Sequence, residues 1–490
     1  MNATLTVLIA FSVSVISIEV FTRLAPVLGL VDRPGGHKHH HHPVPLVGGL
    51  ALFTATTVAA TIYFFFDVGP ATNYGTLFGA TAIVALTGFA DDVWELGPKV
   101  RMGLQAVAAL VMVLGAGVVL VDLGQLLGPS VFVLAGFSIP FTVFATCGVI
   151  NSFNMTDGMD GLAGSLSLVS FALLGSTAYA SGNLEQATIA AFMMAAIVGF
   201  LLFNLRYPGH HRASVYLGDT GSYVIGFVLA WLCIDLSQGP ERAFSPVTAL
   251  WIFGFPLFDT LAVMIRRRWL GSPLLESDRT HFHHLLNDAG FRVSHSVYIT
   301  TGLHLVIGVV GVQGYYLGAP DFVMFYLGIG CFVSYAYVVS RPWRFVPVVQ
   351  RLHRSLGLST ADTDRIYVGN LTPERVMQQL APLGELVGKV AGAALFEHPG
   401  SGYQYAVVEV VPMQFRSILR DMRQRLPPEV TVRPFVPRYE DNDRRGGQSD
   451  KLYEDQRSGD RRLANDAAVH PQFTFSGPQW QWQSTQLRSG

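Results

Sequence analysis

The sequence predicts an all-α polytopic membrane protein of about eleven transmembrane helices, followed by a small α+β ferredoxin-like cytoplasmic domain and a disordered tail. Half of the 490 residues are hydrophobic and only 14% are charged, whereas soluble domains carry about 25% charged residues. Apolar stretches of about 20 residues, the length that spans a bilayer, recur over the first two thirds of the chain. They lie at 3–30, 44–66, 73–90, 103–121, 131–150, 161–179, 187–205, 221–236, 244–264, 297–317 and 320–340.

Charge and cysteine content exclude several function classes. The formal net charge of −1 argues against nucleic-acid binding as the main role of the chain. All three cysteines, Cys147, Cys233 and Cys331, lie in apolar runs. We therefore predict that they are packing residues and that the chain has neither a disulfide framework nor a CxxC metal site.

The basic residues of the loops predict the orientation. One alternating set of loops contains eleven Lys and Arg residues, and the other set contains only Arg242. The eleven are Arg33, Lys38, Lys99, Arg101, Arg206, Arg212, Arg266, Arg267, Arg268, Arg279 and Arg292. Because basic loops stay in the cytoplasm, we predict that the N-terminus lies outside and that the polar face and the C-terminus lie in the cytoplasm.

Aspartates gather at span boundaries on this predicted cytoplasmic face. A fully buried charge at the centre of a bilayer costs roughly 2.5–3.5 kcal/mol on insertion scales, so we expect a cation, substrate or water to compensate them. Mg²⁺ binds a few carboxylate or amide oxygens and completes its shell with water and phosphate. For any single aspartate, a solvated capping role in a loop is the alternative. The five are Asp91, Asp92, Asp157, Asp160 and Asp219, with Asn154 before the second pair.

Basic residues and histidines occur on the same face. Lys38 lies in a run of histidines (37 and 39–42), and the segment DRTHFHH contains Arg279, His281, His283 and His284. A zinc site is the weaker reading, because cysteine ligands are absent and an arginine beside the histidines suits an anion. For His39, His41 and His42 a plain interfacial role is the alternative. Acids for a metal and cations for phosphates, on one membrane face, predict transfer between a soluble phosphorylated donor and a lipid acceptor.

Five motifs occur in order along the first 342 residues. They are DRPGGHKHHHHPVPLVGG (32–49), GFADDVWELGPKVRMGLQ (88–105), INSFNMTDGMDGLAGS (150–165), VYLGDTGS (215–222) and FPLFDTLAVMIRRRWLGSPLLESDRTHFHHLL (255–286). In these motifs the chain resembles the polyprenyl-phosphate N-acetylhexosamine-1-phosphate transferases, the group containing WecA, TagO and MraY. The DRxHxHH pattern is more similar to the WecA branch than to the muramoyl-pentapeptide branch.

The resemblance implies an activity. It implies transfer of GlcNAc-1-phosphate from UDP-GlcNAc to undecaprenyl phosphate, with release of UMP, as the first step of a lipid-linked surface glycan. Other UDP-amino-sugars stay open as donors, because His37 and Ser214 stand where related chains often have Arg and Lys. A transporter and a non-catalytic membrane scaffold are the alternatives from other classes.

The resemblance also implies roles for single residues. Mg²⁺, or Mn²⁺, is expected on Asp219 with Asn154 nearby. Asp91 and Asp92 are expected at the lipid phosphate, with Asp91 the better candidate for accepting its proton. The diphosphate and sugar are expected at the basic residues and histidines Lys38, Arg279, His281, His283 and His284. Asp157 and Asp160 are expected to contact the nucleotide or to tune the metal site.

The C-terminal part has the composition of a soluble protein. After a linker (343–363), residues 364–436 alternate in a βαββαβ order, which is typical of a ferredoxin-like domain. The segment IYVGNL and the segment SGYQYAVV partly resemble an RNA-recognition module, but Ser401, Gln404 and Val408 replace residues typical of it. We therefore favour a protein partner or a regulatory role over RNA binding. Residues 437–490 are predicted to be disordered, and the sequence gives no indication of the oligomeric state.

Overall fold

The structure is a computed structural model. It describes residues 3–32, 43–68, 72–210, 212–270 and 281–355. In the C-terminal part it describes residues 364–371, 379, 390–397, 404–410, 415–427, 430–434, 473–475 and 483–484. The chain divides into two compact units, one of residues 1–283 and 293–340, the other of residues 284–292 and 341–490.

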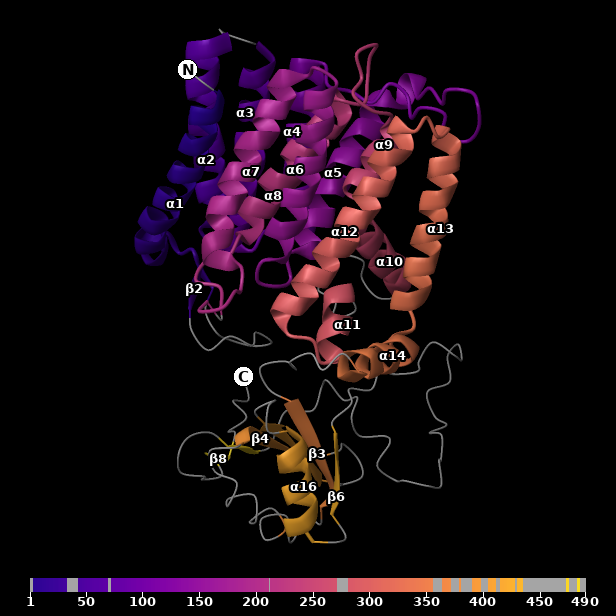
Figure 1. The fold of residues 1–490 in the computed structure, drawn as a ribbon. Helices are drawn as coiled ribbons and strands as arrows, with labels where there is room; N and C mark the ends of the chain where they lie inside the picture. The colour runs from indigo at the N-terminus through magenta and orange to yellow at the C-terminus, as the bar shows by residue number, and fades with distance from the viewer. Residues whose placement is uncertain are drawn as a thin grey trace. The chain divides into compact units, whose positions relative to one another are not determined.

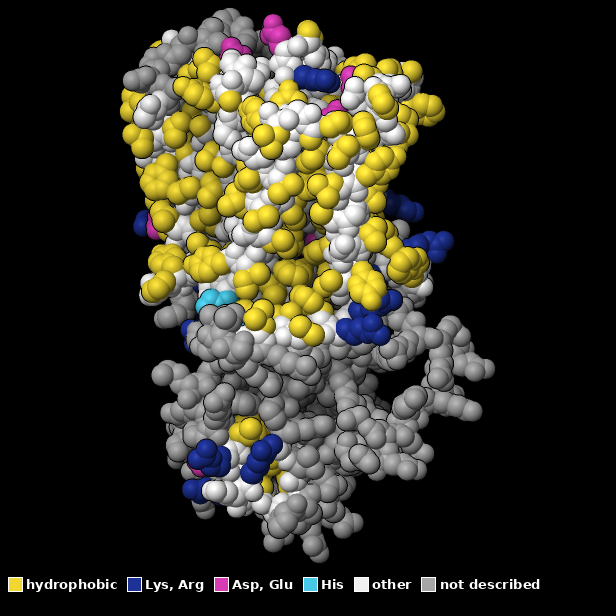
Figure 2. Space-filling view, turned by 45° about the vertical axis from the view of Figure 1, so that its right-hand side comes forward, with side chains coloured by type: hydrophobic (Ala, Val, Ile, Leu, Met, Phe, Trp, Pro, Cys, Tyr) yellow, Lys and Arg dark blue, Asp and Glu magenta, His cyan; other side chains and the backbone are white. Residues whose placement is uncertain are grey.

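The first unit is a bundle of long apolar helices (Figure 1), which confirms the predicted all-α polytopic class. Hydrophobic side chains cover much of the side of this bundle that Figure 2 shows, as expected for a surface in contact with lipid. Among the described residues, nine helices are long and apolar enough to cross a membrane. They are α1 (Ala3–Leu28), α2 (Gly48–Tyr63), α3 (Thr72–Trp94), α4 (Pro98–Ala116), α5 (Ser138–Thr156), α6 (Leu162–Ala180), α7 (Leu184–Asn204), α12 (Val293–Tyr316) and α13 (Asp321–Val339).

The prediction of about eleven continuous spans needs correction at two places. The expected span 244–264 is broken into α9 (Pro246–Ile252) and α10 (Gly254–Leu270), which meet at 81°. Pro256 has no N–H to continue the helical hydrogen bonds of α9, which favours a break here. Counted as one span, the pair brings the candidates among the described residues to ten. The expected span 221–236 is α8 (Gly218–Asp235), which is not among the candidates, since an aspartate near each end lowers its hydropathy.

Helix α8 is the centre of the bundle and packs against α2, α3 and α5. Glycines make this packing close. A Cβ atom at Gly49 of α2 would overlap the backbone of Gly221, and one at Gly88 of α3 would overlap the backbone of Thr220. Small residues let helix backbones approach in this way. As a result, the first turn of α8 lies where three helices meet.

Backbone hydrogen bonds join the connections between helices at this end of α8. Strand β1 (Val31–Asp32) pairs with β2 (Val44–Pro45) in the connection from α1 to α2. Tyr216, in the connection from α7 to α8, donates its N–H to the Pro45 carbonyl and accepts the N–H of Gly48. The first and fourth sequence motifs are thereby held together.

The second unit contains an antiparallel sheet. Its strands β3 (Asp364–Leu371), β4 (Val390–Glu397), β5 (Gln404–Val410) and β6 (Thr431–Pro434) follow the order β6-β3-β5-β4. Helix α16 (Phe415–Arg425) contributes Ile418 and Met422 to its fully buried core, as the helical spacing predicts. The helix expected between β3 and β4 lies almost wholly outside the described residues, so the ferredoxin-like assignment stays a prediction. Two short strands, β7 (Phe473–Phe475) and β8 (Gln483–Ser484), extend the sheet from within the segment predicted to be disordered.

Candidate active site

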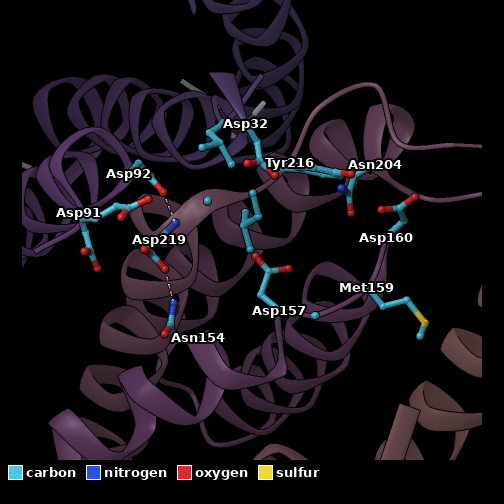
Figure 3. Close-up of a pocket in the computed structure, with 15 residues that line it drawn as sticks. Asp32, Asp91, Asp92, Asn154, Asp157, Met159, Asp160, Asn204, Tyr216 and Asp219 are labelled. Atoms are coloured by element: carbon cyan, nitrogen blue, oxygen red, sulfur yellow. Dashed lines mark hydrogen bonds between the residues drawn. The ribbon is translucent and has the colours of Figure 1, made fainter. Parts of the chain in front are cut away.

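A cavity of about 410 Å³ lies beside the first turn of α8 (Figure 3). Seven of its lining side chains are acidic, and they come from four of the five sequence motifs. All five aspartates singled out in the sequence are among them, together with Asn154. The lining residues are Asp32, Leu46, Asp91, Asp92, Glu95, Asn154, Asp157, Gly158, Met159, Asp160, Asn204, Tyr216, Leu217, Gly218 and Asp219.

Asp92, in the last turn of α3, holds the start of α8. One of its carboxylate oxygens accepts the N–H of Asp219 at 2.7 Å, and the other accepts the N–H and the hydroxyl of Thr220 at 3.1 and 2.7 Å. The first N–H groups of a helix have no partner within the helix, and their end of the helix dipole favours negative charge. Asp92 therefore acts as a cap supplied by a neighbouring helix.

Asp91 is held by a different set of partners. Only 4% of the residue is exposed. One oxygen accepts the N–H of Leu96 at 2.8 Å, and the other accepts an Arg101 N–H at 2.9 Å and the Tyr223 hydroxyl at 2.8 Å. Arg101 and Tyr223 were not predicted as functional residues. Both lie inside or next to quoted motifs, but nothing in their spacing indicates that they meet at Asp91.

Asp219 and Asn154, the predicted metal pair, are in contact. The Asn154 side-chain amide donates to Asp219 Oδ1 at 2.5 Å and to the Ser222 hydroxyl at 3.1 Å (Figure 3). Asn154 comes from the last turn of α5 and Asp219 from the first turn of α8. The packing of these two helices therefore brings together residues that are 65 positions apart in the sequence.

Asp157 and Asp160 lie in the connection between α5 and α6. Burial, reinforced by the negative charges of Asp92 and Asp160, raises the pKa of Asp157 to about 7. Asp160 is neutralised by Arg206, whose Nε lies 2.7 Å from its carboxylate, and it also accepts the N–H of Ala213 at 3.1 Å. The two aspartates therefore differ: Asp160 is tied to the connection that follows α7, whereas Asp157 places an acid of raised pKa in the cavity wall.

One histidine of the last motif, His281, is placed by Asp259, a fully buried residue of α10 that was not predicted. Asp259 bonds His281 Nδ1 at 2.7 Å, the Phe282 N–H at 3.2 Å and the Tyr335 hydroxyl of α13 at 2.6 Å. An ionisable residue inside an apolar helix usually has a bonded partner and a functional role. Asp259 is such a residue, in the segment FPLFD (255–259) at the start of the fifth motif, so the sequence did contain a signal for it. A second histidine of this motif, His283, stacks on His281 with ring centroids 5.6 Å apart.

His283 connects the last motif with the cavity. A Cβ atom at Gly158, a residue of the cavity wall, would lie 2.7 Å from His283 Nε2, so the ring packs directly against this glycine. His281 lies with Asp259 rather than at the cavity. His284 belongs to the second compact unit. Lys38 and Arg279, also predicted at the substrate, lie outside the described residues.

The donor set fits a hard divalent cation. Asp91 and Asp92 use their oxygens for N–H and O–H donors. Two acids of the cavity wall then remain as candidates for a cation: Asp219, which is bonded to Asn154, and Asp157, which follows Asn154 by three residues. Oxygen ligands of this kind suit Mg²⁺, which takes few protein ligands and completes its shell with water and phosphate. Among the described residues, no three Asp, Glu, His or Cys side chains form a ready-made metal cage, so any fit depends on such outside ligands.

Comparison with known proteins gives consistent results. Residues 74–237 match the sequence model of Glycosyl transferase family 4. The chain is 35% identical to the undecaprenyl-phosphate alpha-N-acetylglucosaminyl 1-phosphate transferase of Yersinia pestis, over 71% of this chain and 94% of that protein. It is 36% identical to the protein of the same name from Salmonella typhi, over 71% and 93%. It is 34% identical to that of Haemophilus influenzae, over 71% and 98%.

Proposed function

The chain belongs to Glycosyl transferase family 4, and we propose that it transfers GlcNAc-1-phosphate from UDP-GlcNAc to undecaprenyl phosphate with release of UMP. In this reaction an oxygen of the lipid phosphate forms a bond to the sugar-bearing phosphorus of the donor, and the bond from that phosphorus to the UMP oxygen breaks. The names of the relatives support the two substrates. The observation that supports the chemistry is the single cavity in which aspartates from four motifs converge.

We assign a Mg²⁺ site, which Mn²⁺ would also fill, to Asp219 and Asn154, with Asp157 beside them. When bound, the ion would neutralise phosphate oxygens and the charge that develops on the departing UMP. The contact between Asn154 and Asp219 supports this assignment. An amide can turn its oxygen or its nitrogen toward a neighbour, and the two are assigned from hydrogen-bond partners. Asn154 can therefore serve Asp219 in the free state and a cation in the bound state.

Asp91 and Asp92 are assigned a positioning role at the lipid phosphate. A phosphate monoester has a second pKa of about 6, so most of the nucleophile is already ionised at neutral pH. Asp91 also accepts three hydrogen bonds within the protein. Both points favour in-line positioning and charge neutralisation over proton transfer to Asp91, as in other phosphoryl transfers.

The cationic residues are assigned to the donor. The diphosphate and sugar would be held by Lys38, Arg279, His281, His283 and His284. Asp157 and Asp160 would contact the nucleotide or tune the metal site. Support from the described residues is strongest for His283, which packs against Gly158 in the cavity wall. For His281 the support is indirect, because its ring is bound to Asp259 and stacks on His283.

We further propose that α8 also crosses the membrane, so that the bundle has eleven crossings with the N-terminus outside and the cavity and C-terminus in the cytoplasm. The uneven distribution of Lys and Arg between alternate loops supports this topology. A cytoplasmic cavity would also give a soluble nucleotide sugar access to the site. The inner membrane of a bacterium is the corresponding location.

The activity is tested with purified full-length protein, undecaprenyl phosphate, MgCl₂ and a panel of UDP-sugars, by measuring released UMP. We expect release with UDP-GlcNAc, dependent on the lipid and abolished by EDTA. A higher rate with UDP-GalNAc or another amino-sugar would change the donor but not the reaction. If no donor gave UMP release, the proposed enzymatic activity would be refuted, and a transporter or a non-catalytic scaffold would be the remaining interpretations.

A further inference from the structure

Helix α14 (Pro342–Ser355) begins almost directly after the last membrane-spanning helix, α13. Only Ser340 and Arg341 separate Val339 from Pro342. Three Cα–Cα steps of 3.8 Å span at most about 11 Å. The first turn of α14 must therefore lie close to the membrane boundary at which α13 ends.

The sequence of α14, PWRFVPVVQRLHRS, is amphipathic. Phe345, Val348, Val349 and Leu352 follow the spacing i, i+3, i+4, i+7 that places residues on one helix face. Exposed Arg344 lies one turn before Val348, at the spacing i, i+4, and so borders this face. The helix thus combines an apolar face with a basic residue at its edge, a pattern typical of helices that lie in a membrane surface.

The two edges of the apolar face have different surroundings. On one edge, Val346 and His353 are 2% and 3% exposed. The His353 ring contacts Phe291 of the same compact unit, with ring centroids 4.5 Å apart. On the other edge, Val348 and Leu352 are 62% and 54% exposed. One edge of the helix is therefore anchored in its own unit, and the other presents large apolar side chains.

We propose that α14 lies in the cytoplasmic membrane surface, with the Val348–Leu352 edge at the acyl boundary and Arg344 at anionic phospholipid headgroups. Chain continuity with α13 supports the bilayer as the occupant of this edge, because a helix that starts three residues after a span has its N-terminal end at the membrane surface. Arginine beside an apolar edge suits this position, since its alkyl stem can lie along the apolar surface while the guanidinium reaches a phosphate. The proposal does not depend on the enzymatic function.

The test uses the full-length protein in lipid nanodiscs. Exposed Cys331 is first replaced by serine, whereas Cys147 and Cys233 are buried and are retained. A spin label is then attached to Val348→Cys or, as the control, to Gln424→Cys, an exposed position on α16 of the sheet-containing unit. Collision of each label with oxygen, which concentrates in lipid, is compared with collision with a water-soluble nickel chelate.

We expect the ratio of oxygen to nickel collisions to be several-fold higher at position 348 than at position 424. We also expect the ratio at 348 to fall when phosphatidylcholine alone replaces equal parts of phosphatidylcholine and phosphatidylglycerol, and when Arg344→Gln is introduced. Equal nickel access at the two positions would overturn the proposal. A label at 348 that neither reagent reaches in either lipid would also overturn it, because protein would then cover this edge. UMP release by each labelled variant provides a check that the bundle is folded.

Discussion

The Asp92 carboxylate accepts the backbone N–H of Asp219 at 2.7 Å. Asp92, in the last turn of α3, therefore holds Asp219 in the first turn of α8. The same carboxylate also bonds Thr220, and the two motifs are 127 residues apart in the sequence. The contact provides the first turn of α8 with a negative cap. It also places the Asp219 side chain against Asn154. The two predicted functional acids thus have different roles, because Asp92 shapes the site in which Asp219 acts.

Gly218→Ala tests whether this cap matters to the activity. Gly218 has φ +72°, and a Cβ atom there would lie 2.8 Å from Asp92 Oδ2. The substitution should therefore cost about 1–2 kcal/mol of backbone strain and also displace Asp92 from α8. Gly239→Ala is the matched control, because Gly239 has φ +79° and nothing within 4 Å of such an atom.

We expect both variants to lower the midpoint of thermal unfolding in detergent by similar amounts from backbone strain, with an added loss at Gly218. Only Gly218→Ala should reduce UMP release strongly, by at least about tenfold. Equal activities in the two alanine variants would show that the contact between Asp92 and α8 does not organise the site.

Asp219→Asn should abolish UMP release while the protein remains folded, because an amide replaces the carboxylate assigned to the metal. It should also remove the rise in unfolding temperature that MgCl₂ gives to the wild type, since a ligand that binds only the native state stabilises it. Exposed Glu241→Gln removes one acidic charge outside the cavity and should leave both properties unchanged. Near-wild-type UMP release in Asp219→Asn would remove Asp219 from the metal site.

Much of this site could be predicted from the sequence, and the limits have physical causes. Five aspartates at span boundaries indicated a shared site because charge is unfavourable in a bilayer, and all five line one cavity. The different hydrogen-bond partners and roles of the five aspartates could not be predicted. Whether Asp91 is free or bound to Arg101 depends on how α3, α4 and α8 pack. Hydropathy likewise located the span 244–264 but not its 81° break, which depends on Pro256 and on tertiary contacts.

The raised pKa of Asp157 predicts how the stability of the folded protein depends on pH and on magnesium. Its pKa is raised to about 7, whereas an unfolded aspartate has a pKa of about 3.9. Between these values the metal-free folded state binds more protons than the unfolded state, so its stability should fall as pH rises from about 4 to about 7. Mg²⁺ needs the ionised carboxylate, so its stabilising effect should grow from about pH 6 to about pH 8.

Unfolding temperatures measured with MgCl₂ and with EDTA across this range test the prediction. Asp157→Asn should reduce the pH dependence of the metal-free protein, whereas exposed Glu241→Gln should not. A magnesium effect that is the same at about pH 6 and about pH 8 in the wild type would contradict the assignment of Asp157 beside the metal.

The hydrogen bonds of Asp259 predict that the packing of α10, in the broken span, affects the position of the histidines in the last motif. It accepts bonds from His281, from the Phe282 N–H and from the Tyr335 hydroxyl, all within 3.2 Å. Removing one partner of a buried ionic group costs about 3–5 kcal/mol, so Asp259→Ala should strongly destabilise the protein. Tyr335→Phe deletes one hydrogen bond to a charged group and should cost about 1.5–3 kcal/mol.

Because His281 stacks on His283 at the cavity, loosening this network should raise KM for the UDP-sugar more than it lowers kcat. Asp259→Asn, which preserves shape but removes the charge, separates positioning from folding. If it stays folded and retains wild-type KM, Asp259 serves only the packing of α10 against α13.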